Sequence, residues 1–291
     1  MNQLALYTSF VAVVEHGSFT LAAKHLGKTK AIVSRQVNQL EAQLNSRLIS
    51  RTTRALSVTE SGKEAYQRAR IILEQVDDLN QLSQQQNDQL SGRLRISAPQ
   101  TFAELNLMSV LPSFMQAHPQ LKVELVLNDR YVDIVEDGFD LAIRIGQLED
   151  SNLIARQVTR FKQVLVASPQ YLSHQPISSL EQLAKRPCIV DSNRRGGNKW
   201  QFSHQGKEHS IKVNAILSVN SALAAAAAAE QGLGVCLSPE FAVQQQLAKG
   251  SLVSLLDDYS SGDVGVYVIY PHRQYLTKKI SAFIAHLKQH C

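Results

Sequence analysis

The sequence predicts two regions of different fold class, an all-α region at the N-terminus and an α/β region at the C-terminus, joined by a long helix. Apolar residues recur at helical spacing from 6 to 44, and at the 3.5-residue spacing of packed helices from 65 to 79. From Arg93 onward, short β-branched or apolar runs alternate with helical patterns, which is typical of a largely parallel sheet. We therefore expect three structural regions, 1–58, 59–91 and 92–291.

The overall composition is that of an ordinary globular protein, with 44% hydrophobic and 19% charged residues. The 291 residues suffice for two or three domains of about 100–200 residues each. The chain has no run of about 18 uncharged apolar residues and no basic leader, so neither a membrane span nor a signal peptide is expected. Cys188, Cys236 and Cys291 are scattered, which favours reduced thiols in the cytoplasm over a disulfide framework.

The N-terminal pattern predicts three short helices. Gly17 ends the first helix, Ser18 is placed to cap a second over 19–26, and Thr29 is placed to cap a third. Asn45 ends the third helix as the left-handed residue that glycine usually supplies. Apolar residues on one face of the first and third helices predict the core: Leu6, Phe10, Val13 and Val14, then Val33, Val37, Leu40 and Leu44.

The outward face of the third helix carries short or hydrogen-bonding side chains. Two short helices with a tight turn, the second polar and basic outward, have the helix-turn-helix layout, in which the second helix enters the major groove of DNA. Residues 47–59 predict two short strands around a Thr-Thr-Arg tip, a wing that brings basic side chains to phosphates or the minor groove. The residues expected to contact DNA are Ser18, Thr29, Lys30, Ala31, Ser34, Arg35, Asn38, Arg51, Thr52 and Arg54.

The charge distribution agrees with this interpretation. Residues 20–58 contain seven basic residues and one acid, Glu41, a net charge of +6 against +5 for the whole chain. Localised positive charge of this kind favours binding to a phosphate backbone. A solvated basic face has the same composition, so the charge argument depends on the helix-turn-helix behind it.

The stretch GSFTLAAKHLGKTKAIVSRQVNQLEAQLNSRLISRTTRALSVTESG, from Gly17 to Gly62, resembles the DNA-binding region of LysR-type transcriptional regulators. The resemblance implies a sequence-specific DNA-binding regulator that is not an enzyme, acts on promoter DNA, and forms a homodimer or homotetramer. RNA polymerase is a further candidate partner. The positions that match the family pattern are Ser18, Phe19, Ala22, Ala23, Leu26, Val33, Ser34, Leu40, Glu41, Leu44, Leu48, Arg51, Thr59 and Gly62.

Two departures from the family pattern concern the DNA bases that the third helix contacts and the packing of the wing. The family often has Ser-Gln-Pro or Ser-Gln-Ser where this chain has Thr29-Lys30-Ala31. A lysine in place of glutamine favours contact with guanine or phosphate over bidentate pairing with adenine. Ile49 stands where phenylalanine is usual, a change in packing.

Residues 59–91 predict a long helix capped by Thr59, followed by a Gln-rich tail and a Ser91-Gly92 hinge. In LysR-type regulators this linker helix joins two subunits, so the resemblance implies a dimerisation seam; the alternative is a helix packed only on its own chain. The seam residues are Ala65, Ala69, Ile72, Val76 and Leu79.

The C-terminal region predicts a two-lobed α/β sensor domain of the periplasmic-binding-protein type, and the family resemblance implies the same fold. Lobe I comprises about 92–160 plus 266–291, and lobe II about 161–265. Two strand patterns follow each other from 153 to 166 without a helix, as expected where the chain crosses between lobes. Strands are expected at 94–97, 123–127, 141–145, 164–167, 188–190, 216–219, 234–237 and 264–270, and helices at 105–118, 221–231, 240–248 and 276–288.

Ligands in such sheets lie beyond the carboxyl ends of strands, near helix N-termini that attract anions. We expect a small, anionic effector in a cleft between the lobes, with Arg144 pairing a ligand carboxylate. The alternative for Arg144 is an ion pair with Asp137 or Asp140, and for Thr101 and Ser221 it is helix capping. The residues expected to line this site are Ser97, Pro99, Gln100, Thr101, Asn128, Arg144, Asp191, Asn220 and Ser221.

Other chemistry has weak support in the sequence. The nucleotide-binding and hydrolase motifs G-x-G-x-x-G, G-x-x-x-x-G-K-[ST], H-E-x-x-H and G-x-S-x-G are absent. We expect neither a cofactor nor a metal, since His286, His290 and Cys291 lie at a frayed end. The open alternatives are a thiol-responsive regulator sensing through Cys236, and a solute-binding protein or enzyme.

Overall fold

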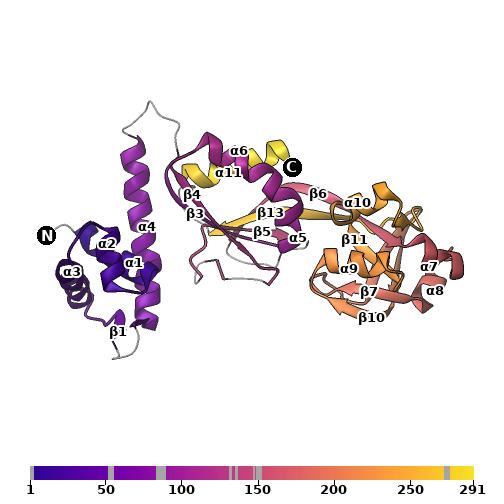
Figure 1. The fold of residues 1–291 in the computed structure, drawn as a ribbon, viewed down its shortest axis with the longest axis horizontal. Coiled ribbons are helices and arrows are strands. Elements are labelled where there is room, and N and C mark those ends of the chain that lie inside the picture. Colours follow the sequence, from indigo (N-terminus) through magenta and orange to yellow (C-terminus); the bar gives the residue numbers. More distant parts are fainter. Residues whose placement is uncertain are drawn as a thin grey trace. The chain divides into compact units, whose positions relative to one another are not determined.

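A computed structural model describes residues 3–51, 56–82, 90–130, 133–134, 137–146, 148, 153–271 and 276–291. The chain divides into two compact units (Figure 1). One is formed by Met1–Asp88 with Val135–Gly138, and the other by Gln89–Ile134 with Phe139–Cys291. The long helix after the wing belongs to the first unit.

The N-terminal unit begins with three helices, α1 (Gln3–His16), α2 (Phe19–His25) and α3 (Lys30–Gln43). Both predicted caps are present, since Ser18 Oγ accepts backbone N–H groups of α2 and Thr29 Oγ1 accepts one from α3. Gly17 and Asn45 both have positive φ, 59° and 47°. Local side-chain chemistry therefore starts and ends these helices where it was expected to.

One apolar cluster holds the three helices and the wing together. Its largest fully buried members are Phe10, Leu6, Leu40 and Leu48. The predicted core position of Leu44 is wrong, because its side chain is 47% exposed. Leu44 is the residue that caps the end of α3, so it lies beyond the last turn that packs on α1.

The wing consists of β1 (Ile49–Arg51) and β2 (Leu56–Val58), paired antiparallel. Glu41, the single acid of the basic segment, has a structural role here. Its Oε1 accepts the backbone N–H groups of Leu48 and Ile49 at 2.8 and 3.0 Å, which ties the end of α3 to the start of the wing. Thr52 and Arg54, predicted at the wing tip, lie outside the described residues.

The linker helix α4 (Glu60–Leu82) begins at Thr59, whose Oγ1 accepts the Gly62 N–H at 3.0 Å. Gly62 permits close packing, because a Cβ there would lie 2.0 Å from the Leu48 carbonyl oxygen. Along the predicted seam, Ala69 is 3% exposed and packs in the core of its own chain, whereas Ile72 and Leu79 are 39% and 62% exposed. The first part of the seam is thus already covered within the chain.

The C-terminal unit contains a mixed sheet in the order β10-β7-β11-β6-β13-β5-β3-β4, with β12 also paired to β6. In lobe I, β3 (Gly92–Ala98) pairs parallel with β4 (Leu121–Leu127) and β5 (Leu141–Ile145). The late strand β13 (Asp263–Pro271) pairs antiparallel with β5, and α11 (Lys278–His290) packs beside α6 (Met108–Ala117). The last strand and the last helix of the chain therefore lie beside β5 and α6.

The two strand patterns expected from 153 to 166 form a single strand, β6 (Leu153–Ala167). Its first part pairs with β13, and its last part pairs with β11 (Val235–Pro239) and β12 (Val253–Ser254). One continuous strand therefore belongs to both lobes. In lobe II, β7 (Pro187–Asp191) pairs parallel with β10 (Asn214–Val219) and β11.

Lobe II carries helices α7 (Pro169–His174), α8 (Leu180–Lys185), α9 (Ala222–Glu230) and α10 (Glu240–Lys249). The sequence predicted α9 and α10 but not the hairpin β8 (Lys199–His204) and β9 (Lys207–Lys212). This hairpin buries Trp200 and Phe202 in the lobe II core. Apart from these two residues and Ile211, its positions are polar, so the hairpin has only a short apolar alternation to mark it.

Three phenylalanine rings join the two lobes. Phe161 of β6 lies 4.7 Å from Phe241 of α10, and Phe102 lies 5.9 Å from Phe241, between ring centroids. Phe102 comes from lobe I, Phe241 from lobe II, and Phe161 from the strand they share. The Phe102–Phe241 pair is edge-to-face and the Phe161–Phe241 pair is tilted, and aromatic pairs of this kind add directional packing to simple burial.

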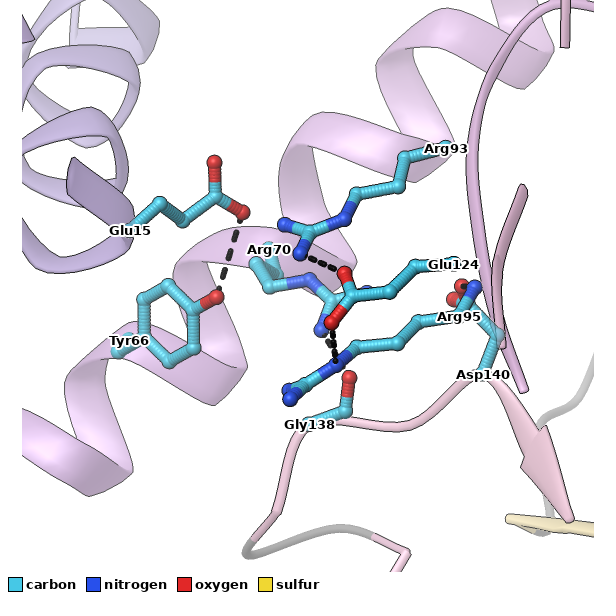
Figure 2. Close-up of polar contacts among 8 residues, drawn as sticks. All are labelled: Glu15, Tyr66, Arg70, Arg93, Arg95, Glu124, Gly138 and Asp140. Atoms are coloured by element: carbon cyan, nitrogen blue, oxygen red, sulfur yellow. Dashed lines mark hydrogen bonds and ion pairs between the residues drawn. The ribbon is translucent and has the colours of Figure 1, made fainter. Parts of the chain in front are cut away.

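Ionic contacts fix the start of the C-terminal sheet. Figure 2 shows Glu124 of β4 between Arg93 and Arg95 of β3, and both arginines form ion pairs with it. Partial burial by itself raises the pKa of Glu124, but these two arginines outweigh burial and lower that pKa overall. The neighbouring Asp140 is fully buried; it accepts the Arg95 N–H at 2.7 Å and lies 3.4 Å from Lys279 Nζ.

Among the described residues, no single helix is long and apolar enough to cross a membrane. The pair α1 and α2 passes such a test together by length and composition, but the two helices are bent by 120°. Both contribute to the core of the N-terminal unit.

Candidate nucleic-acid interface and effector site

The third helix presents a polar and basic face to solvent. The side chains of Lys30, Ala31, Arg35 and Asn38 are exposed, and Ser34 is half-buried between them. These five residues lie on the side of α3 opposite Val33, Val37 and Leu40, which are buried. The structure therefore divides α3, as predicted, into a buried apolar face and an outer face rich in hydrogen-bond donors.

Ser18 and Thr29 occupy the N-terminal ends of α2 and α3. Their side-chain oxygens accept backbone N–H groups, at 3.2 Å for Thr20 N and 3.3 Å for Ile32 N. Each hydroxyl therefore has a structural task in addition to any contact with DNA. Two further exposed cations, outside α3 and the linker helix, are Lys24 and Arg47. Of Arg51, only the backbone position is described.

Two large apolar side chains on the same helices were not predicted as site residues. Leu21 of α2 is 54% exposed and Ile32 of α3 is 44% exposed. Ile32 lies in the first turn of α3, next to Ala31. Aliphatic side chains at a recognition helix can contact thymine methyl groups in the major groove. The available signal was the helical spacing, which leaves both residues outside the buried stripe.

In lobe I, Arg144 and Ser97 lie together at the carboxyl ends of β5 and β3. Arg144 is 4% exposed and donates to Ser97 Oγ at 3.1 Å, and to the carbonyl oxygens of Ile143 and Arg130 at 2.7 and 3.2 Å. Asp140, an alternative partner for Arg144, is hydrogen-bonded to the Arg95 N–H and lies beside Lys279. The guanidinium is held by protein oxygen atoms inside the lobe.

The helix after β3 has an unexpected N-terminal partner. It starts as α5 (Gln100–Phe102), continues as a π-helical turn η1 (Ala103–Leu107), and runs on into α6. Asp129 Oδ1 accepts the Gln100 N–H at 3.2 Å, although Asp129 was not among the residues predicted to line the site. The N-cap residue is Pro99, so the capping alternative for Thr101 is wrong; Thr101 lies inside the first turn and is 7% exposed.

Burial raises the pKa of Asp129, while the Gln100 N–H and Arg144 act in the opposite direction. In lobe II, burial also raises the pKa of Asp191, and the charge of Asp129 raises it further. Asp129 follows β4 and Asp191 ends β7, so the charges at the ends of these two strands influence each other.

The remaining predicted residues have mainly local partners. Asn128 Oδ1 accepts the Arg130 N–H at 2.9 Å in a turn. Ser221 accepts the Ala224 N–H at 3.3 Å, which confirms its alternative assignment as the cap of α9. The Asn220 carbonyl accepts Asn193 Nδ2 at 2.8 Å, so Asn193 joins the end of β10 to the loop after β7.

Both units match family models. Residues 4–63 match the bacterial regulatory helix-turn-helix protein, lysR family, and residues 87–291 match the LysR substrate binding domain. The two matches follow the division of the chain into a helix-turn-helix head and an α/β domain.

The full chain is also similar to characterised regulators. It is 35% identical to the HTH-type transcriptional regulator PtxR of Pseudomonas aeruginosa, over 100% of this chain and 93% of that protein. It is 32% identical to the HTH-type transcriptional activator TtdR of Escherichia coli K12, over 97% of this chain and 91% of that protein.

Solved structures give the same result for the whole architecture. The full-length Vibrio cholerae virulence activator AphB is 31% identical, with a TM-score of 0.61 and 100% of both chains covered. CrgA from Neisseria meningitidis, a LysR-type transcriptional regulator, is 28% identical, with a TM-score of 0.63 over 98% of this chain and 97% of that one. The chain therefore belongs to the LysR family of bacterial transcription regulators.

Proposed function

We propose that the exposed face of α3 reads base edges in the major groove of promoter DNA, and that a small molecule bound in the C-terminal unit changes this reading. The observation that carries the proposal is the row of exposed donors on α3, held in place by the Thr29 cap and the buried stripe. Arg35 and Lys30 supply base contacts, with guanine as the favoured partner. Exposed cations outside α3 contact phosphates.

The effector site is proposed at the strand ends that carry Ser97, Arg144, Asp129 and Asp191. Arg144 favours a ligand with an anionic group, as the sequence suggested. Asp129 and Asp191 favour a hydrogen-bond donor or an amino group on the same ligand, because their burial makes two nearby negative charges costly. We therefore infer a small effector that combines an anionic group with a donor group.

Thermal-shift screening of the full chain with small carboxylic acids, with and without an amino group, tests the effector site. Binding at the proposed place predicts that Arg144→Ala and Thr101→Val each reduce the shift caused by the effector. A compound that stabilises both variants as strongly as the wild type binds elsewhere, and the assignment is then wrong.

For the assembly we propose a dimer through α4, with a tetramer formed by pairing of C-terminal domains. A groove of about 360 Å³ lies between α1, α3 and α4, and its lining includes Tyr7, Leu44 and Ile72. Exposed apolar side chains beside a groove favour an interface with another helix. Ala69 lies at its floor and is covered by its own chain, so the seam is narrower than the heptad pattern indicated.

Ile72 and Ile71 offer a matched pair of variants for this interface. Both are partly exposed, at 39% and 36%, but only Ile72 lines the groove. We expect Ile72→Glu to dissociate the dimer and to abolish DNA binding at the same protein concentration, and Ile71→Glu to leave both unchanged. Sedimentation measures the first effect. A native oligomer for Ile72→Glu contradicts the seam.

The thiol-responsive alternative is less well supported. Solved relatives include the regulatory domain of AphB from Vibrio vulnificus treated with cumene hydroperoxide, at 29% identity and a TM-score of 0.55. In this chain Cys236 is fully buried, and burial raises its pKa to about 12. A buried thiol with so high a pKa supplies little of the thiolate that reacts with oxidants.

A further inference from the structure

Three polar side chains form a hydrogen-bonded cluster at the otherwise apolar core of the N-terminal unit. Gln36 Oε1 accepts a hydrogen bond from Ser9 Oγ at 2.5 Å and one from Lys28 Nζ at 3.2 Å. Ser9 is fully buried and Gln36 is 8% exposed. We call this set, Ser9, Lys28 and Gln36, the Gln36 cluster. It joins α1, the turn before α3, and α3 itself.

The cluster supplies a constraint that the surrounding apolar contacts lack. Val33, Val37 and Leu40 press α3 against α1 and α2, but hydrophobic contact is not directional and tolerates small rotations of a helix. A hydrogen bond weakens steeply when its angle departs from linearity. Two bonds to one oxygen atom from two different segments therefore select one rotation of α3 about its axis.

Arg35 directly precedes Gln36 in α3, so the rotation of the helix that Gln36 fixes also sets the direction of the Arg35 side chain. Successive residues of a helix are about 100° apart around its axis. Even a small rotation of α3 about this axis would therefore move the Arg35 side chain relative to the base edges in the DNA major groove. A base contact requires correct placement, whereas a phosphate contact through a long cationic side chain tolerates displacement. Loss of the Gln36 cluster should therefore reduce discrimination between DNA sequences more than it reduces the overall affinity for DNA.

We propose that Gln36, held by Ser9 and Lys28, is a positioning residue for sequence discrimination by α3. This proposal rests on the proposed function of α3 as the base-reading helix. Lys28 belongs to the basic segment by sequence, but its ammonium group is directed to Gln36 and serves orientation of the helix.

The test compares Gln36→Leu with Gln36→Glu in the full chain. Leucine has a similar volume but accepts no hydrogen bond, whereas glutamate accepts from both Ser9 and Lys28. The measured quantity is the ratio of affinities for two probes at one salt concentration: a duplex enriched from a randomised pool by the wild-type protein, and the unenriched pool. We expect Gln36→Leu to reduce this ratio by about 10-fold or more, and Gln36→Glu to keep it within about 3-fold.

An unchanged ratio in Gln36→Leu overturns the proposal, as does an equal reduction in both variants. If Gln36→Leu does not fold, Ser9→Ala decides, because it removes one donor and leaves Gln36 bound to Lys28: a reduced ratio supports the proposal and a wild-type ratio overturns it. Arg35→Ala separates this result from the proposed function. If Arg35→Ala keeps the wild-type ratio, α3 is not the base-reading helix and the proposed function fails first.

Discussion

The two units differ in the polar side chains that they bury. In the N-terminal unit, Lys30 and Arg35 are exposed around an apolar core, and among its described residues the buried polar ones are the neutral Ser9 and Gln36. In the C-terminal unit, Asp140 and Arg144 are buried and hydrogen-bonded to protein groups. Exposed cations are available to a polyanion and contribute little to folding, whereas buried charges hold a fold together and are costly to disrupt.

This difference fits the two tasks. A promoter is a long polyanion that is met at the surface, and its attraction is screened by salt. A small effector is bound instead by groups of the α/β domain, and at the proposed site these include the half-buried Asp129 and Asp191. Substitutions of charge should therefore change DNA binding in the first unit and stability in the second.

The largest effect is expected for Asp140→Ala. The change leaves Lys279 Nζ and the Arg95 N–H without their carboxylate, and should lower the free energy of unfolding by about 3–5 kcal/mol. Urea unfolding followed through Trp200, the single tryptophan, measures this. Asp258→Ala, at an exposed position, is the control and should have little effect. Equal stability of the two variants contradicts the structural role of Asp140.

The next effect concerns the exposed charges. Arg35→Ala should weaken binding to an enriched duplex by about 1–3 kcal/mol, in a sequence-dependent way, and leave the unfolding transition nearly unchanged. Lys24→Ala, on α2, should weaken binding to all sequences by a similar factor. Fluorescence anisotropy with enriched and random duplexes distinguishes the two. Equal losses on both probes for Arg35→Ala would place Arg35 at the phosphate backbone.

A smaller effect, of opposite sign, is expected for Asp191→Asn. Burial and the charge of Asp129 raise the pKa of Asp191, so the folded chain holds this proton more tightly than the unfolded chain does. Stability therefore falls as pH rises from the ordinary aspartate pKa through the raised value. Asp191→Asn should raise the Tm by roughly 2–4 °C at pH 7, with no gain below the ordinary aspartate pKa. A lower Tm at pH 7 contradicts this electrostatic account.

The smallest effect is expected for Glu124→Gln. Its two arginine partners lower the pKa of Glu124, so the stabilisation is present above the ordinary glutamate pKa and is lost as pH falls through the lowered value. Because the Glu124 side chain is 35% exposed, solvent screens the pair, and we expect a loss of about 1 kcal/mol or less. Unfolding should be measured at neutral and at acid pH. The difference in the free energy of unfolding between wild type and Glu124→Gln should disappear at acid pH.

Sequence reasoning succeeded where the physical cause is local. Ser18, Thr29 and Thr59 cap helices because a hydroxyl near a helix N-terminus accepts the next free N–H groups, and this depends on three or four consecutive residues. It failed for Leu44, whose spacing fits the buried stripe, because the helix ends at Gln43 and periodicity does not reveal where packing stops.

The amino-acid sequence by itself therefore determined the helix-turn-helix, the linker helix, the alternating α/β pattern and the outer face of α3. Each of these features arises from periodicity and capping within a short segment. Only the tertiary structure decided that β6 is one strand shared by two lobes, that the charge of Asp129 raises the pKa of Asp191, and that Ser9 contacts Gln36. These contacts join residues 27 or more positions apart, where no local pattern connects the partners and the packing of whole elements sets the geometry.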